Sequence, residues 1–162
     1  MSPSLRARSG LPWARLFQCL IAFLVISSAS ALADNTSTGS LKILLDGFGS
    51  DKGSAMLALY NSKDTFTKSE NAVRSTSVEI KGGKAEVLLK DLPFGTYAGK
   101  VFHDENGNGK LDTTLFGIPK ERYGFSNNAR GAFGPATWAA AQFSFEQAEM
   151  TIHITVKHYL GP

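Results

Sequence analysis

The segment from Asp104 to Asp112 (Asp-Glu-Asn-Gly-Asn-Gly-Lys-Leu-Asp) has the spacing in this chain that most clearly suggests chemistry. Oxygen-bearing side chains stand at alternate positions, Asp104, Asn106 and Asn108, before a glycine and the further carboxylate of Asp112. Calcium loops of the EF-hand type use this spacing, because alternate oxygens converge on one hard cation while the glycine permits a sharp bend. The pattern predicts calcium ligands on these four side chains, with the backbone carbonyl of Lys110 as a further ligand.

The segment departs from the helical calcium motif at its end. The motif places a bidentate glutamate three residues after the position of Asp112, where this chain has Leu115. A complete site therefore has to borrow Glu105, Glu121 or water. Two firm carboxylates alone indicate a weak site, with a dissociation constant of about 10⁻⁴ to 10⁻³ M, as in extracellular modules. The alternative is a metal-free turn, in which Asp and Asn side chains hydrogen-bond their own backbone.

A second chemical hypothesis is a hydrolytic site formed by His103, Asp104 and Glu121. It requires the imidazole and a carboxylate to lie within about 3 Å of each other in one concave pocket, as proton transfer demands. The other imidazoles are His153 and His158. Histidines serve many roles, and the simplest interpretation is that all three are unrelated surface residues. The sequence therefore offers no convincing catalytic set.

The N-terminus has the layout of a secretory signal peptide. Three arginines precede an apolar run at residues 16–26, and small residues then lead to Ala31-Leu32-Ala33. We expect cleavage near Ala33, which makes residues 1–33 a leader and places the mature protein in the bacterial periplasm or outside the cell. A retained membrane helix is the alternative, but the strictly apolar run is only half of the ~20 residues that a spanning helix needs.

Loss of this leader changes the charge of the chain. The full sequence has 17 Lys and Arg against 14 Asp and Glu, and the excess of three positive charges equals the three leader arginines. A neutral mature chain without a basic run has no electrostatic footprint for nucleic acid or anionic membrane. The single cysteine, Cys19, also lies in the leader. Disulfides, thiol catalysis and thiolate metal sites are therefore excluded from the mature protein.

The mature chain has the pattern of short strands separated by turns. A polar, flexible start is expected at residues 34–40, and a single domain at 41–162. Apolar residues then alternate in the segments 41–45, 54–60, 78–89, 96–102, 143–145 and 150–156. Gly82-Gly83 predicts a hairpin, because the pair supplies the positive φ angles of a tight turn. With a closing hairpin at 143–156 and a short helix or loop at 65–74, the pattern predicts a mainly β, antiparallel sandwich or barrel.

A long stretch at residues 112–141, spaced by glycine and proline, interrupts the strands. Its aromatic residues are Phe116, Tyr123, Phe125, Phe133 and Trp138. Because a long loop stays ordered only if it has apolar contacts of its own, we expect these aromatics to be buried. If exposed, they would stack on a sugar, a peptide or a partner. A charged rim is expected from Lys120, Glu121, Arg122 and Arg130.

Several longer motifs resemble a known family. They are Leu92-Pro93-Phe94-Gly95-Thr96-Tyr97-Ala98, the segment 102–112, Phe116-Gly117-Ile118-Pro119-Lys120-Glu121, Tyr123-Gly124-Phe125-Ser126-Asn127-Asn128 and Phe133-Gly134-Pro135. Over essentially the whole mature chain they are similar to the bacterial secreted family of domain of unknown function 2141, which has no established activity. The Leu-Pro-x-Gly-x-Tyr element also resembles transthyretin-like, prealbumin-type domains. That resemblance implies a β-sandwich of about seven strands that acts as a binding, spacer or stabilising module, although fold alone does not supply function.

We therefore expect a periplasmic or secreted, non-enzymatic module that binds a small ligand or an envelope protein and has calcium as its candidate cofactor. The hydrolytic site around His103 is one alternative. An accessory subunit that adds its edge strand to an envelope assembly is another, and it predicts an exposed, uncharged sheet edge. Neither a nucleic-acid partner nor a transmembrane anchor after cleavage is expected.

Overall fold

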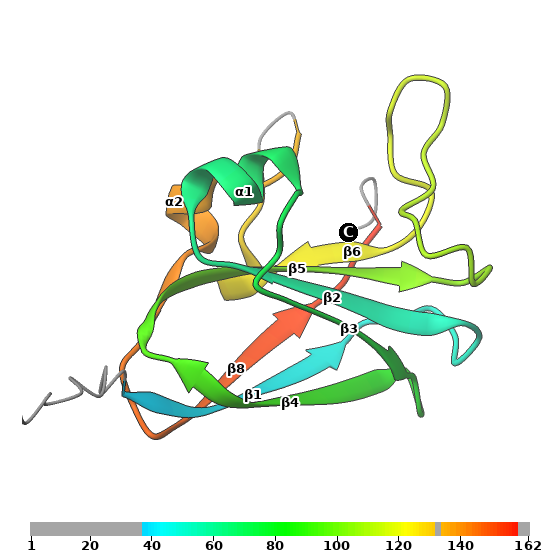
Figure 1. Cartoon of the computed structure of the whole chain (residues 1–162). Coiled ribbons are helices and arrows are strands. Elements are labelled where there is room, and N and C mark those ends of the chain that lie inside the picture. The colour runs from blue at the N-terminus through cyan, green and yellow to red at the C-terminus, as the bar shows by residue number, and fades with distance from the viewer. Residues whose placement is uncertain (1–36, 132–133, 159–162) are drawn as a thin grey trace, which may run out of the picture. The chain divides into compact units, whose positions relative to one another are not determined.

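The computed structural model of the chain (Figure 1) describes residues 37–131 and 134–158. The expected leader with its cleavage point near Ala33, and Phe133 of the long stretch, lie outside these ranges. In the described part, eight strands form two sheets, which confirms the mainly β class. No helix within the described ranges is both long enough and apolar enough to cross a membrane.

The first sheet has the strand order β4–β1–β8. Its central strand β1 (Thr38–Asp46) is antiparallel to β4 (Lys84–Pro93) and parallel to β8 (Glu149–Thr155). The parallel pair corrects the expectation of a purely antiparallel fold. The flexible start expected at 34–40 is also wrong from Thr38 onward, because Thr38 pairs with Pro93, and the Ser37 carbonyl accepts a 2.8 Å hydrogen bond from the N–H of Phe94.

The second sheet has the order β3–β2–β5–β6, with β7 also paired to β5. These strands are antiparallel, and they are β2 (Ser54–Tyr60), β3 (Arg74–Glu79), β5 (Gly95–Asp104), β6 (Tyr123–Phe125) and β7 (Phe143–Phe145). The closing hairpin expected at 143–156 is wrong, since β7 pairs with β5 while β8 pairs with β1 of the other sheet. The alternation of apolar residues fixes which face of a strand is buried, but not which strand lies beside it.

The tight turn expected at Gly82-Gly83 is present, with φ angles of 59° and 71°. Lys81 and Lys84 on either side of it form an antiparallel bridge, with backbone hydrogen bonds of 2.8 and 3.2 Å. The predicted hairpin ends there, because β3 before the turn and β4 after it belong to different sheets, so the turn is a corner between them. The Asp51 carboxylate holds this corner by accepting hydrogen bonds from the N–H groups of Gly82 at 2.8 Å and Gly83 at 2.7 Å. These two bonds, that from Gly83 most of all, lower the pKa of Asp51.

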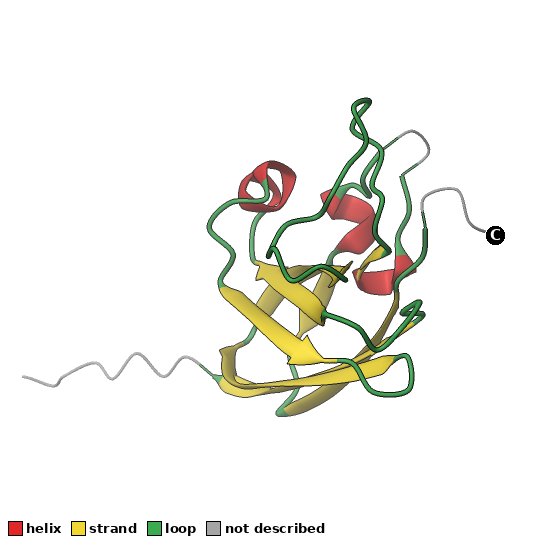
Figure 2. Cartoon of the chain, turned by 90° about the vertical axis from the view of Figure 1, so that its right-hand side faces the viewer, coloured by secondary structure: helices red, strands yellow, loops and turns green. Residues whose placement is uncertain are grey.

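Helix α1 (Lys63–Lys68) covers part of residues 65–74, for which the sequence predicted either a short helix or a loop. Ser62 caps its start by accepting a hydrogen bond from the Thr65 N–H, as polar N-caps commonly do. Lys100 of β5 closes its end, since Nζ donates to the Phe66 carbonyl at 2.6 Å and to Ser69 Oγ at 2.7 Å. Burial lowers the pKa of Lys100. Figure 2 shows the helices, among them α1 and α2 (Trp138–Ala141), gathered on one side of the strands.

The largest apolar cluster takes side chains from both sheets. Leu41, Ile43 and Leu45 of β1 lie in it with Leu57 and Leu59 of β2, and each is at most 3% exposed. A second cluster forms around Phe66 of α1, whose ring lies 5.7 Å from Tyr60, 6.1 Å from Phe125 and 5.8 Å from Trp138. This second cluster attaches the helices to the outer side of the second sheet.

We predict that Asp51→Asn destabilises the protein at neutral pH and has less effect in acid. The hydrogen bonds place the folded-state pKa of Asp51 below its ordinary value of 3.8. The stabilisation is therefore complete above that value and is lost as the pH falls through the lowered pKa. Urea unfolding of both proteins from pH 7 down into the acid range measures it. The exposed residue Asp91, changed in the same way, is the control, and an Asp51→Asn difference that stays constant into acid contradicts the prediction.

Candidate functional site

Asp104 ends β5 as a buried carboxylate, with 2% of the residue exposed. Its two oxygens accept hydrogen bonds from the backbone N–H groups of Gly107 at 2.9 Å, Asn108 at 3.1 Å and Gly109 at 2.8 Å. Both glycines have positive φ angles, 74° and 72°, which glycine adopts without steric cost. The chain thus folds around this carboxylate in a tight turn.

The other predicted ligands face one another beyond this turn. Asn106 Nδ2 donates to Asp112 Oδ2 at 2.6 Å, and Asn108 Nδ2 donates to Asp112 Oδ1 at 3.1 Å. The amide oxygens of Asn106 and Asn108 accept backbone N–H groups, the latter that of Lys110 at 2.8 Å. The structure therefore brings the predicted residues together in the arrangement of a self-bonded turn. Among the described residues, no group of three or more His, Asp or Glu side chains is placed to hold a metal ion.

Glu121 is a pin across the loop and not part of a charged rim. It is only 8% exposed. Its Oε1 accepts the N–H of Glu105 at 3.1 Å, and its Oε2 accepts the N–H of Asp112 at 3.0 Å. One side chain thereby joins the two ends of the loop at residues 105–112, which we call the pinned loop. Of the other rim residues, Lys120 and Arg130 are exposed, while Arg122 is half-buried and donates to the Gly47 carbonyl.

His103 is fully buried, which overturns its interpretation as a surface histidine. Its Nε2 lies 2.8 Å from the Lys52 carbonyl oxygen, and its ring packs edge-on against Phe48. Nδ1 lies 3.3 Å from Glu105 Oε1, without the geometry of a hydrogen bond. His153, by contrast, is exposed and lies 2.9 Å from Asp46 Oδ2, as expected for a surface residue.

The side chains of the hydrolytic hypothesis are each engaged elsewhere. The His103 ring faces a backbone carbonyl and Glu105, while the oxygens of Asp104 and Glu121 accept backbone N–H groups. Three pockets in the described part of the chain are lined by other residues. What this neighbourhood does in the structure is order the loop.

A narrow finger, residues 112–120, extends from the pinned loop and rises away from the sheets (Figure 2). Its stem is held by hydrogen bonds from Lys120 N–H to the Asp112 carbonyl and from Thr114 N–H to the Ile118 carbonyl, both 2.8 Å long. At its tip Leu115 and Phe116 are 102% and 90% exposed. The expected burial of the aromatics is therefore wrong for Phe116, whereas Phe125 is buried and Tyr123 and Trp138 are half-buried.

The motif after the finger works as a clamp. In the short helix η2 (Ser126–Asn128), Ser126 Oγ accepts the Gly99 N–H at 2.9 Å and donates to the Ala141 carbonyl. Asn127 Nδ2 donates to the Gln142 carbonyl at 2.7 Å, and Asn128 Oδ1 accepts the Thr155 N–H at 2.8 Å. Three consecutive side chains thus join β5, the end of α2, and β8.

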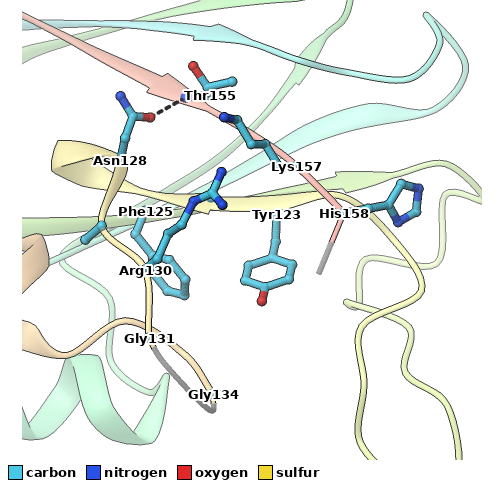
Figure 3. A pocket seen from close by; sticks show the side chains of 11 residues that line it. Tyr123, Phe125, Asn128, Arg130, Gly131, Gly134, Thr155, Lys157 and His158 are labelled. Atoms are coloured by element: carbon cyan, nitrogen blue, oxygen red, sulfur yellow. Dashed lines mark hydrogen bonds between the residues drawn. The ribbon is translucent and has the colours of Figure 1, made fainter. Parts of the chain in front are cut away.

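Between β6, η2 and the end of β8 lies a pocket of about 320 Å³ (Figure 3). Gly124 lets β6 approach β8 closely at this point, because a Cβ at that position would lie 2.8 Å from the Thr155 carbonyl oxygen. The basic side chains that line the pocket are Arg130, Lys157 and His158, and no Asp or Glu lines it. The sequence predicted Arg130 on a charged rim and His158 as an unrelated surface histidine, whereas Lys157 follows a strand and carries no recognisable motif.

We predict that Asp104→Asn lowers the free energy of unfolding by about 1–3 kcal/mol, the cost of an unsatisfied buried group. The amide replaces one acceptor oxygen with an NH₂ group, which then faces a backbone N–H. Urea unfolding measures the loss, and hydrogen exchange should accelerate at the amides of Gly107, Asn108 and Gly109. Asp91→Asn, an exposed change of the same kind, is the control. Unchanged exchange at these amides contradicts the assignment of Asp104 as the centre of the turn.

The comparisons with known proteins agree with this picture at the level of family. A family model described as "Uncharacterized protein conserved in bacteria (DUF2141)" matches residues 43–153, from β1 through most of β8. No curated protein and no solved structure matches the chain. The matched range contains the pinned loop, the finger and the Ser126–Asn128 clamp. The sequence motifs that resemble the family lie partly in these segments. The chain belongs to the bacterial DUF2141 family.

Proposed function

We propose that this protein is a non-enzymatic, secreted binding module that attaches to a protein of the bacterial envelope through its finger. The observation that carries the proposal is the pair of neighbouring apolar side chains, Leu115 and Phe116, that stand almost fully exposed at the tip. Single exposed apolar residues are common on protein surfaces and need no explanation. Two adjacent ones on a projecting, hydrogen-bonded stem are typical of a binding surface.

The order of the finger favours this role. Its stem is hydrogen-bonded along its length, and Glu121 and Asp104 fix its base. A preordered loop loses little conformational entropy when it binds, so more of the contact energy appears as affinity. Full burial of a Leu or Phe side chain contributes about 1.5–3 kcal/mol. A pocket that accepts both tip side chains therefore gains a binding hot spot of the kind that dominates many interfaces.

Other features support a module over an enzyme. The carboxylates of Asp104 and Glu121 are occupied with backbone N–H groups and are not free for proton transfer. Two sheets that share one apolar cluster support a prealbumin-like β-sandwich. The signal-like leader and the restriction of cysteine to it support export. The β4 edge carries exposed charges, Lys84, Glu86 and Lys90, which protect an edge against strand addition and disfavour the edge-strand alternative there.

A photo-crosslinker placed at position 116 tests the partner. We expect irradiation with envelope extract to give one dominant protein adduct. The same probe at position 88 is the matched control, because Leu88 is an exposed apolar residue on β4. Unlabelled wild-type protein should compete for the adduct, while the double variant Leu115→Ser/Phe116→Ser should not.

Three outcomes contradict the proposal: no adduct, an equal adduct from position 88, or an adduct with lipid in place of protein. The double variant replaces exposed residues only, so its melting temperature should match that of the wild type. That match confirms that a loss of competition reflects the lost tip and not unfolding.

Calcium binding by the loop is a second candidate. It is motivated by the proximity of Asn106 and Asn108 to the Asp112 carboxylate. A cation there would require both amides to turn their oxygens toward it in place of their NH₂ groups, with the Lys110 carbonyl and Asp104 as the other predicted ligands. In that case calcium stiffens the base of the finger and has no catalytic part.

Isothermal titration and thermal unfolding decide the calcium question. At 10 mM calcium and a dissociation constant of about 1 mM, binding stabilises the folded state by about 1.4 kcal/mol, which raises the melting temperature by several degrees. The variant Asp112→Asn should lose the effect, while Asp91→Asn retains it. Absence of both binding heat and a melting shift at this concentration rules the calcium site out.

A further inference from the structure

We infer that the pocket between β6, η2 and the end of β8 binds a small organic anion. The ligand we expect carries a carboxylate or phosphate head on a planar, apolar body. This site is separate from the finger tip, and its occupation does not depend on the envelope partner proposed above.

The frame of the pocket is fixed by hydrogen bonds. Tyr123 and Lys157 exchange two backbone hydrogen bonds, of 3.1 and 3.0 Å, which hold the chain after β8 against β6. The Asn128 side chain accepts the Thr155 N–H at 2.8 Å on the other side of the opening. Figure 3 shows Arg130 extending from the segment after η2 toward β6, with Lys157 on the adjacent end of β8. The pocket is therefore held open in the free protein.

The chemistry of the lining selects an anion. Its basic side chains are Arg130, Lys157 and His158, of which Arg130 and Lys157 are cations, and it contains no Asp or Glu. Within the described ranges the charged ends of these three side chains make no ion pair and no hydrogen bond. Because Asn128 Oδ1 is occupied by Thr155, the amide offers its NH₂ group as a further donor. The two cations Arg130 and Lys157 line one pocket that has no carboxylate to balance them, which favours an anionic ligand.

The aromatic residues of the lining determine the rest of the ligand. The rings of Tyr123 and Phe125 lie 5.8 Å apart in an edge-to-face arrangement and both line the pocket. Aromatic surface beside basic side chains suits a ligand with a flat apolar body next to its charge, and arginine prefers carboxylate and phosphate because its planar fork matches them. The volume of about 320 Å³ suits a single small molecule.

Calorimetric titration with matched probes tests the inference. Phenyl phosphate and benzoate carry both the ring and the charge, inorganic phosphate carries the charge alone, and phenol carries the ring alone. We expect an aryl anion to bind, inorganic phosphate to bind more weakly, and phenol not to bind. The stronger of the two aryl anions identifies the preferred head group. The affinity should fall as ionic strength rises, because the attraction is electrostatic.

The double variant Arg130→Gln/Lys157→Gln should weaken aryl-anion binding by at least about tenfold, as expected for lost charged hydrogen bonds. Lys63→Gln/Lys90→Gln removes the same charge from exposed sites outside the pocket and should leave the affinity unchanged. Both variants alter exposed side chains, and unchanged melting temperatures confirm that they fold. Equal affinity in the two variants, binding of phenol as tight as that of phenyl phosphate, or no binding of either aryl anion overturns the inference.

Discussion

The structure between β5 and β6 depends on two nearly buried carboxylates, Asp104 and Glu121, and on the backbone that surrounds them. A buried carboxylate without partners is costly, so the chain must supply hydrogen-bond donors to it. Here the donors are N–H groups of the loop itself, three for Asp104 and two for Glu121. Opening the loop would break these hydrogen bonds and leave both carboxylates without their N–H donors. An excursion without regular secondary structure is thereby held in one conformation.

Hydrogen bonds from side chains to the backbone hold other loops of the described structure as well. Asp51 holds the Gly82-Gly83 corner, and the clamp of Ser126, Asn127 and Asn128 joins three elements by side-chain bonds to the backbone. Small exported domains often use disulfides for this purpose. No cysteine lies within the described residues, and side-chain hydrogen bonds of roughly 1 kcal/mol each take over the task. This explains why Asp, Asn and Ser lie at the turns in patterns that resemble ligand sets.

Local structure was predictable from this sequence, and long-range pairing was not. Period-two alternation identified β1, β2 and β5, and Gly82-Gly83 identified a turn, because these depend on neighbouring residues alone. The partners of β7 and β8 depend on how the sheets assemble, and the alternation of apolar residues does not predict that. His103 shows a missed signal: it continues the buried alternation of Tyr97 and Val101 along β5, but its position beside an acidic loop favoured a surface interpretation.

The pinned loop also connects the two surfaces that we propose for binding. The excursion leaves β5 at Asp104 and returns as β6 at Tyr123, two residues after Glu121. The hydrogen bonds of Glu121 that order the finger therefore also hold the strand that forms one wall of the pocket at Arg130 and Lys157. A change in the pin should therefore disturb both surfaces at once. A change at the tip or among the basic side chains acts on a surface whose frame stays intact. The buried carboxylates that hold the frame and the exposed side chains that we propose for contact are thus different sets of residues.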